Sequence, residues 1–250
     1  MSAVGLVVVS HSRALGEAAA GLGREVLQGG QVRVEVAAGL DDGSLGTDAT
    51  AVLAALERAE QGDGVVVLMD LGSAVLSAEL ALELLDDAAR ERVVLSPAPL
   101  VEGLVAACVA AAGGADRSAV AAEAGAGLAG KQAHLGQRAA VEVAAPAAPA
   151  PGGAAGTNGE VTARITVTAP HGLHARPAAQ LVQAARAAPA PVECRNATTG
   201  TDWVAATSMA QVSVLAVLHG HELELRASGP AAREAVDALL AVLQAADERS

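Results

Sequence analysis

Aromatic side chains are almost absent from this 250-residue chain, which has one tryptophan and no phenylalanine or tyrosine. Basic residues are also few, with 16 Lys and Arg against 28 Asp and Glu, so the formal net charge is −12. A chain this acidic repels nucleic-acid phosphates and anionic lipid, and it lacks the aromatic rings on which bases stack. We therefore expect neither nucleic acid nor a membrane surface as a partner.

Cysteine occurs only twice, at Cys108 and Cys194, and neither lies in a CxxC motif. This number and spacing exclude a disulfide framework and a cysteine zinc site. The first ten residues lack the basic segment of a secretory signal, and no apolar run approaches ~18 residues without a break. Together these absences predict a cytoplasmic protein in a reducing compartment.

Composition changes sharply once along the chain. Of the 21 residues from 139 to 159, 16 are Ala, Pro or Gly, a bias typical of a linker. We predict a first domain over residues 1–130, a linker over 131–159 and a second domain over 160–250. The first domain carries seven basic and 18 acidic residues and the second carries seven and nine, so nearly all of the acidity belongs to the first domain.

Short apolar runs alternate with helical patterns through the first domain. Fully apolar strands separated by helices indicate a parallel sheet covered on both faces, which right-handed crossovers make doubly wound. The fold class is therefore α/β, with ligands expected at the carboxyl ends of the strands. The predicted strands are 4–9, 32–36, 65–69 and 93–95, and the predicted helices are 15–27, 50–59, 74–85, 100–112 and 117–129.

The second domain has the order strand, helix, two strands, helix, strand, helix in fewer than 100 residues. Its first strand alternates apolar and polar residues, which is typical of a sheet with one open face. We predict a small open-faced α/β sandwich with helices on one face of an antiparallel sheet. The predicted strands are 161–168, 192–196, a segment around Trp203, and 222–227; the helices are 175–187, one beginning near Ser208, and 230–246.

The first candidate site lies where two apolar strands end. His11 comes just after strand 4–9, and Asp70 directly follows strand 65–69. These strand ends lie beside each other in a doubly wound sheet. A carboxylate next to an imidazole fixes its tautomer and makes the other ring nitrogen a better nucleophile. A lone histidine is more often an ordinary loop or core residue, so the interpretation depends on Asp70.

Residues that could hold an anion follow the strands 65–69 and 32–36. Gly72 and Ser73 begin a helix, whose free N–H groups would face the same cleft. Thr47 ends the Gly-rich segment 41–47, which would overhang the same edge, but on physical grounds alone an ordinary turn followed by a helix N-cap is the better explanation of that segment. The set suits a phosphoryl group carried on a histidine nitrogen. Nucleotide binding is excluded at the first strand end, because neither a GxGxxG motif nor a Walker lysine loop is present.

Four motifs of the first domain resemble the mannose-type enzyme IIA domain, and more closely the phosphotransfer subunit of the phosphoenolpyruvate-dependent dihydroxyacetone kinase. The likeness covers about residues 1–128. It implies that His11 is phosphorylated, that Asp70 is its neighbour and that the domain forms a homodimer. The motifs are Val-Ser-His-Ser at 9–12, Asp-Asp-Gly followed by Leu-Gly-Thr at 41–47, Met-Asp-Leu-Gly-Ser-Ala at 69–74 and Ala-Pro-Leu-Val-Glu-Gly at 98–103.

The second candidate site is the segment Pro-His-Gly-Leu-His-Ala-Arg-Pro-Ala at 170–178. His174 would cap the following helix, where a phosphoryl group meets free N–H groups and the positive helix end, with Arg176 as a charged clamp. Pro177 is tolerated because first-turn N–H groups have no partner within the helix. This segment closely resembles the active-site signature of the histidine-containing phosphocarrier protein HPr over about residues 161–248, which implies phosphorylation of His174 by enzyme I.

The remaining histidines and the start of the helix near Ser208 also receive assignments. His171 is predicted to be a turn residue, and Ser208 is predicted to be a helix N-cap rather than a regulatory serine. Met209 and Val212 are assigned to an exposed apolar patch that docks partners. No chemistry is assigned to three further histidines, His134, His219 and His221.

The two resemblances together imply a phosphoryl relay. Enzyme I passes phosphate from phosphoenolpyruvate to His174, His174 passes it to His11, and His11 phosphorylates ADP on the nucleotide-binding subunit of the kinase, which then phosphorylates dihydroxyacetone. Mg²⁺ and ADP are expected on that partner, with no cofactor or metal on this chain. Because the sequence ends at Ser250, enzyme I is expected to be a separate protein. The alternatives are a IIA–HPr component of a sugar transport system and a regulatory module whose phosphorylation state is read by another protein.

Overall fold

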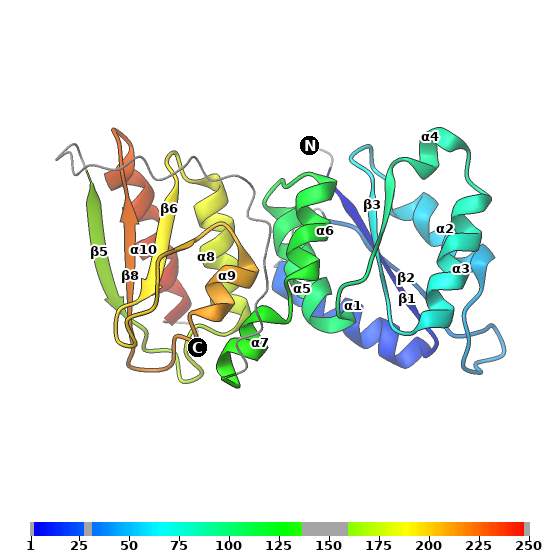
Figure 1. Cartoon of the computed structure of the whole chain (residues 1–250), viewed down its shortest axis with the longest axis horizontal. Helices are drawn as coiled ribbons and strands as arrows, with labels where there is room; N and C mark the ends of the chain where they lie inside the picture. The colour runs from blue at the N-terminus through cyan, green and yellow to red at the C-terminus, as the bar shows by residue number, and fades with distance from the viewer. Residues whose placement is uncertain (1–2, 28–31, 137–159, 248–250) are drawn as a thin grey trace. The chain divides into compact units, whose positions relative to one another are not determined.

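The computed structural model describes residues 3–27, 32–136 and 160–247 of the chain. It divides into two compact units, residues 1–128 and residues 129–250 (Figure 1). The elements of the first unit are β1 (Gly5–Ser10), α1 (Arg13–Leu27), β2 (Val34–Ala38), α2 (Ala49–Ala59), β3 (Val65–Met69), α3 (Gly72–Glu83), α4 (Asp87–Arg90), β4 (Val93–Ser96), α5 (Leu100–Ala112) and α6 (Arg117–Gly125).

The first unit is a doubly wound α/β sandwich, as the sequence predicts. Its four strands are parallel and run in the order β2-β1-β3-β4. Helices α1, α5 and α6 contribute buried residues to the core on one face of the sheet, and α2 and α3 contribute to the core on the other. Every residue of β1 is buried, which explains why this strand is a continuous apolar run.

Helix α3 packs on the sheet through its alanines and exposes its leucines. Ala74, Ala78 and Ala81 are fully buried, whereas Leu76 and Leu80 are 66% and 50% exposed. Small side chains allow the helix to approach the strands closely, but the leucines at i and i+4 are left facing away from the core of their own unit. An exposed apolar stripe of this kind is a feature of surfaces that contact another protein.

The second unit is an antiparallel sheet with the strand order β5-β8-β6-β7. Helix α10 contacts β5, β6 and β8, and α8 packs against α10, so one face of the sheet is covered. The elements are α7 (Ala129–His134), β5 (Val161–Thr166), α8 (Ala175–Ala187), β6 (Val192–Asn196), β7 (Val204–Ala205), α9 (Met209–Val214), β8 (Glu222–Ala227) and α10 (Ala232–Asp247).

The other face of this sheet carries a network of charges. Glu224 accepts hydrogen bonds from Arg164 Nε at 3.0 Å and from Arg195 Nε at 2.7 Å. Desolvation disfavours the charged carboxylate, but the bonds from Arg195 and Arg164 outweigh it and hold the pKa of Glu224 below its ordinary value. The guanidinium groups of Arg195 and Arg226 lie 4.6 and 4.3 Å from the Trp203 ring centroid. A paired, charged face of this kind fits the predicted open-faced sandwich.

Helix α7 lies where the sequence predicted the start of the linker. It contacts α9, and the approach is close at Gly130, where an added Cβ would lie 2.5 Å from the Ser213 Cβ. A glycine is therefore required for this helix crossing. The prediction of a linker beginning at residue 131 is wrong for residues 131–134, which are helical. The greater part of the predicted linker, residues 137–159, lies outside the described residues.

Candidate functional site

His11 and Asp70 lie together at the carboxyl ends of two neighbouring strands. Val9 of β1 pairs with Met69 of β3, so the residues that follow each strand reach the same edge of the sheet. In the strand order β2-β1-β3-β4, the chain turns to opposite sides of β1, and the β1–β3 boundary is the topological switch point where α/β sheets bind ligands. The sequence interpretation placed the first site at this edge.

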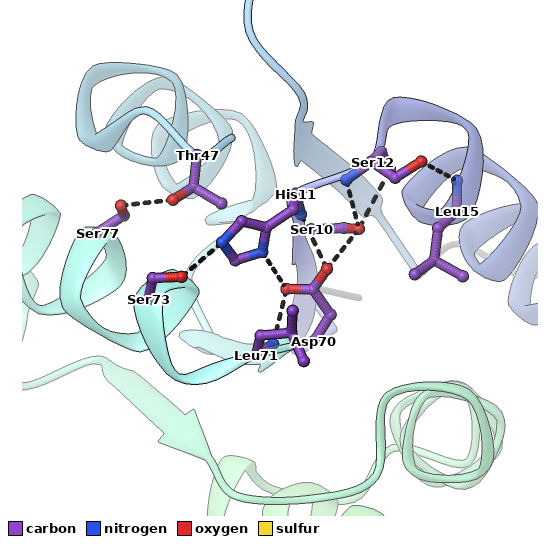
Figure 2. Close-up of polar contacts among 9 residues, drawn as sticks. All are labelled: Ser10, His11, Ser12, Leu15, Thr47, Asp70, Leu71, Ser73 and Ser77. Carbon is purple, nitrogen blue, oxygen red and sulfur yellow. Dashed lines mark hydrogen bonds and ion pairs between the residues drawn. The ribbon is translucent and has the colours of Figure 1, made fainter. Parts of the chain in front are cut away.

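The Asp70 carboxylate is held by four hydrogen bonds (Figure 2). Its Oδ1 accepts from the His11 ring Nδ1 at 2.8 Å and from the Leu71 N–H at 2.7 Å. Its Oδ2 accepts from the His11 backbone N–H at 2.8 Å and from the Ser10 hydroxyl at 2.9 Å. Desolvation favours the neutral acid, but the bonds from His11, Ser10 and Leu71 outweigh it and hold the pKa of Asp70 below its ordinary value. Asp70 is therefore ionised near pH 7.

This carboxylate sets the tautomer of His11. An ionised carboxylate only accepts hydrogen bonds, so the His11 Nδ1 must carry the hydrogen and the Nε2 of the neutral ring has a free lone pair. The Ser73 Oγ lies 2.6 Å from that Nε2 and donates to it. The side chain of His11 remains 22% exposed, against 9% for Asp70. The arrangement presents a nucleophilic nitrogen at the surface, with its partner carboxylate behind it.

The amino-terminal end of α3 lies beside this nitrogen. Leu71 is the N-cap and makes no side-chain cap hydrogen bond, and Gly72 and Ser73 form the start of the helix. A helix start carries partial positive charge and N–H donors, which suit an oxyanion such as a phosphoryl group. Since Ser73 both begins the helix and contacts Nε2, a group bound to Nε2 would lie against the helix end.

The Thr47 side chain contacts helix α3 and not the His11 ring. Its hydroxyl lies 2.8 Å from the Ser77 Oγ, one turn along the helix from Ser73. The preceding residue, Gly46, donates its N–H to the His11 carbonyl at 3.0 Å. The segment 41–47 is thus tied to both β1 and α3. The sequence predicts Thr47 as a residue of this site but not Ser77 or Ser10, which the structure adds to it.

The second site is built on the start of α8. His174 is the N-cap residue, makes no side-chain cap bond and is exposed. The loop that carries His174 is anchored by a backbone hydrogen bond, in which Leu173 donates its N–H to the Val217 carbonyl at 2.9 Å. The ring of His171 lies 6.2 Å from the His174 ring, edge-on at 76°. His171 lies in a turn, as the sequence predicted, and its ring also flanks that of His174.

The environment of His174 favours its neutral, nucleophilic form. Desolvation lowers its pKa, and the positive charges of His171 and Arg176 lower it further. Arg176 stands in the first turn of α8, two residues beyond His174. Because the pKa is lowered, the neutral imidazole persists to lower pH than in a free histidine.

Replacing His171 with asparagine is expected to raise the pKa of His174, because the change removes a positive charge that opposes its protonation. A larger protonated fraction near pH 6 should then slow phosphorylation of His174 at that pH. NMR titration of the ring protons measures the pKa directly. His134→Asn, the same exchange in α7, is the control and should leave the pKa of His174 unchanged. A fall in that pKa in His171→Asn would contradict the assignment.

The structure corrects the predicted docking patch. Met209 and Val212 are only 7% and 2% exposed, because α9 packs against α7 and α8. Ser208 is the N-cap of α9, and its Oγ accepts from the Gln211 N–H at 3.2 Å, in the role that the sequence predicted for it.

Two histidines to which the sequence analysis gave no chemistry have structural partners. The Asn196 side-chain amide donates to the His221 Nδ1 at 3.0 Å. The His219 Nδ1 donates to the Thr168 carbonyl at 3.0 Å. Both histidines belong to the segment 217–221, which binds the His174 loop through the Val217 carbonyl.

The described ranges contain neither a cluster of metal ligands nor a helix suited to cross a membrane. Across residues 3–27, 32–136 and 160–247, no group of three or more His, Cys, Asp or Glu side chains is placed to hold a metal ion. Among the helices of those same ranges, none combines the length and apolarity needed to cross a membrane.

Comparison with known families matches each unit to a phosphotransferase-system component. Residues 5–121 match the model of the PTS system fructose IIA component, and residues 161–245 match that of the PTS HPr component phosphorylation site. His11 and His174 lie inside these two ranges. The fold and the matches define the chain as a phosphotransferase-system protein with a mannose-type IIA domain followed by an HPr domain.

Curated relatives narrow this class. The chain is 43% identical to the phosphoryl donor subunit DhaM of the PEP-dependent dihydroxyacetone kinase of Pantoea ananatis, over 94% of this chain and 48% of the relative. It is 37% identical to the corresponding DhaM of Listeria innocua, over 42% of this chain and 84% of that shorter relative. The chain therefore belongs to the DhaM family of phosphoryl donor subunits.

The HPr unit also has relatives of its own. It is 35% identical to the phosphocarrier protein HPr of Vibrio cholerae, over 32% of this chain and 91% of the relative. The chain spans about half the length of several of the DhaM proteins that it matches along nearly its whole length.

Proposed function

We propose that this chain is a two-histidine phosphoryl relay that serves a dihydroxyacetone kinase. Enzyme I phosphorylates His174 at the expense of phosphoenolpyruvate, His174 passes the group to His11, and His11 passes it to ADP held by a nucleotide-binding partner. The observation that carries the proposal is the His11 site: Asp70 fixes the hydrogen on Nδ1, and Nε2 faces the start of α3. That geometry suits a nucleophile which accepts a phosphoryl group and then releases it.

The transfer to His11 requires no proton movement at the acceptor. The Ser73 hydroxyl turns its hydrogen from Nε2 to a phosphoryl oxygen, and the freed Nε2 lone pair of His11 attacks phosphorus and forms a new N–P bond, while the N–P bond of the donor histidine breaks and its electron pair returns to the donor ring. The hydrogen on Nδ1 stays in its bond to Asp70, which stabilises the positive charge that develops on the His11 ring. Ser73 and the start of α3 supply donors for the phosphoryl oxygens.

The relay order is tested with labelled phosphoenolpyruvate, enzyme I and the full chain. Replacing His174 with alanine is expected to abolish labelling of His11, and addition of a separate HPr should restore it. His134→Ala is the matched control and should keep both labels. Labelling of His11 at the normal rate in His174→Ala without added HPr would contradict the relay.

The onward partner is tested by mixing the phosphorylated chain with an ADP-loaded nucleotide-binding subunit of the kinase. The proposal predicts formation of ATP together with loss of the phosphohistidine. A sugar-transport component or a regulatory module would give no ATP in this assay. The nucleotide and its Mg²⁺ are assigned to that partner.

Self-association and location complete the proposal. A homodimer through the first unit is supported by the exposed leucines of α3 and by β4, an edge strand of the sheet, since both are surfaces that a second copy can cover. Sedimentation of the chain as a monomer alone would contradict it.

A cytoplasmic location is supported by Cys108 and Cys194, which are both free thiols and therefore suit a reducing compartment.

A further inference from the structure

Ser10 is a buried polar side chain beside the His11 site. It is the last residue of β1, and its exposed fraction is 0%. A buried hydroxyl needs hydrogen-bond partners, because leaving it without them costs free energy. The Ser10 Oγ accepts the N–H of Ser12 at 3.2 Å, and it has two acceptors within reach of its own hydrogen, the Ser12 carbonyl at 3.1 Å and the Asp70 Oδ2 at 2.9 Å.

The single hydroxyl hydrogen favours Asp70. An ionised carboxylate is a stronger acceptor than a neutral carbonyl, and the contact with Asp70 is also the shorter of the two. Figure 2 shows the hydroxyl pointing at the carboxylate from the side opposite Leu71. Of the four donors that the described residues give to Asp70, Ser10 is the one hydroxyl; the others are two backbone N–H groups and the His11 ring.

We propose that Ser10 is a positioning residue for phosphoryl transfer at His11, acting through Asp70. The inference rests on the proposed function of His11. The carboxylate can rotate about its Cβ–Cγ bond, and its two oxygens have different tasks. With Ser10 and the His11 N–H both bound to Oδ2, that oxygen is fixed and Oδ1 is left facing the ring nitrogen.

Fixing the Asp70 carboxylate also fixes the orientation of the His11 ring during the reaction. Attack by Nε2 leaves the His11 ring positively charged, with phosphorus on Nε2 and hydrogen on Nδ1. The stabilising charge of Asp70 is effective only while Oδ1 remains in line with that hydrogen. Loss of the Ser10 hydroxyl leaves Oδ2 with one donor, so the carboxylate turns more freely and the ring populates its second tautomer, in which Nε2 carries the hydrogen and cannot attack.

The test compares Ser10→Ala with Ser12→Ala in the full chain. Ser12 is two residues away and its Oγ accepts from the Leu15 N–H at 3.3 Å. We expect Ser10→Ala to slow labelling of His11 by about tenfold, the lower end of the losses seen when the outer hydrogen-bond partners of metal-bound histidines are removed. ¹⁵N NMR of the ring should show a mixture of tautomers in Ser10→Ala and the Nδ1–H form in Ser12→Ala. An unchanged tautomer in Ser10→Ala, or an equal loss in Ser12→Ala, would overturn the proposal.

A second arm separates positioning from a general structural defect. In an Asp70→Asn background, Ser10→Ala should add less than about twofold, because residues that act through one another are not additive. A further tenfold loss there would show that Ser10 acts independently of Asp70. If Ser10→Ala does not fold, Ser10→Cys, a weaker donor of similar size, should give a smaller loss of the same kind, and no loss would count against the proposal.

The ring tautomer is measured without any phosphoryl donor, so it tests Ser10 even if His11 proves not to be phosphorylated. Conversely, normal labelling of His11 in Ser10→Ala with an unchanged tautomer would remove the role of Ser10 and leave the relay intact.

Discussion

Replacing Asp70 with asparagine is expected to reduce the rate of His11 phosphorylation by about 10³-fold or more, the scale seen when a histidine loses the carboxylate that orients it. Asp70 contributes the charge that stabilises the developing positive ring and the acceptor that holds the hydrogen on Nδ1. An amide provides no charge and can present its NH₂ group to the ring instead. Transfer of label from phosphorylated HPr to the variant measures the effect.

The same exchange elsewhere in the unit gives the control. Asp116 is the N-cap of α6, where its Oδ1 accepts from the Ala119 N–H at 2.9 Å, and asparagine is also a good N-cap. Asp116→Asn should therefore keep the normal rate. Labelling of Asp70→Asn at a rate close to that of Asp116→Asn would show that Asp70 does not orient His11.

Replacing Gly172 with alanine is expected to lower the free energy of unfolding of the second unit by roughly 3 kcal/mol, since the left-handed backbone costs an alanine about 1–2 kcal/mol and overpacking adds a similar amount. Gly172 has a φ of +66°, and an added Cβ would collide with the Val217 carbonyl and lie 2.8 Å from the Leu218 Cα. Because this residue is two positions before His174, labelling of His174 should also fall.

Gly200→Ala is the matched control for Gly172→Ala. Gly200 has nearly the same φ, +68°, but no heavy atom lies within 4 Å of an added Cβ. In Gly200→Ala the free energy of unfolding should fall only by the cost of a left-handed backbone, about 1–2 kcal/mol, and labelling of His174 should stay normal. Trp203 is the only tryptophan of the chain, so its fluorescence in urea follows the second unit alone. Equal losses in the two variants would contradict the close contact at Gly172.

Elements whose pattern is local were predicted well from the sequence. The strand 65–69 and the helices 100–112 and 175–187 have the predicted bounds, because apolar runs and helical periodicity are properties of the segment itself. The edge strand β2 begins two residues later than predicted, at Val34. Its limits are set by pairing with β1, from Leu6 opposite Val34 to Ser10 opposite Ala38, which no local pattern encodes.

The short helices depend on contacts that the sequence does not display. Residues 117–129 were predicted as one helix, but α6 ends at Gly125 and α7 begins at Ala129. α7 has no apolar period of its own, and its place is determined by the approach of Gly130 to Ser213. The four-residue helix α4, capped by Asp86, is too short for any periodicity to reveal.

At the first site, the predicted topology was sufficient to place His11 beside Asp70, because neighbouring parallel strands end at a common edge of the sheet. Ser10 was not assigned a role, although a signal was present: it follows the apolar run 4–9 and shares the buried strand with it. A polar residue in that position requires a partner. Which partner it finds depends on the rotamer of Asp70, and that is decided only by the folded structure.

The packing of α7 on α9 places this helix in the second unit. Residues 126–128 therefore lie between α6, the last helix of the first unit, and α7, the first helix of the second. An insertion at these three residues falls at the junction of the two units and leaves α7 intact, whereas an insertion at Gly130 would disturb the close approach of α7 to Ser213.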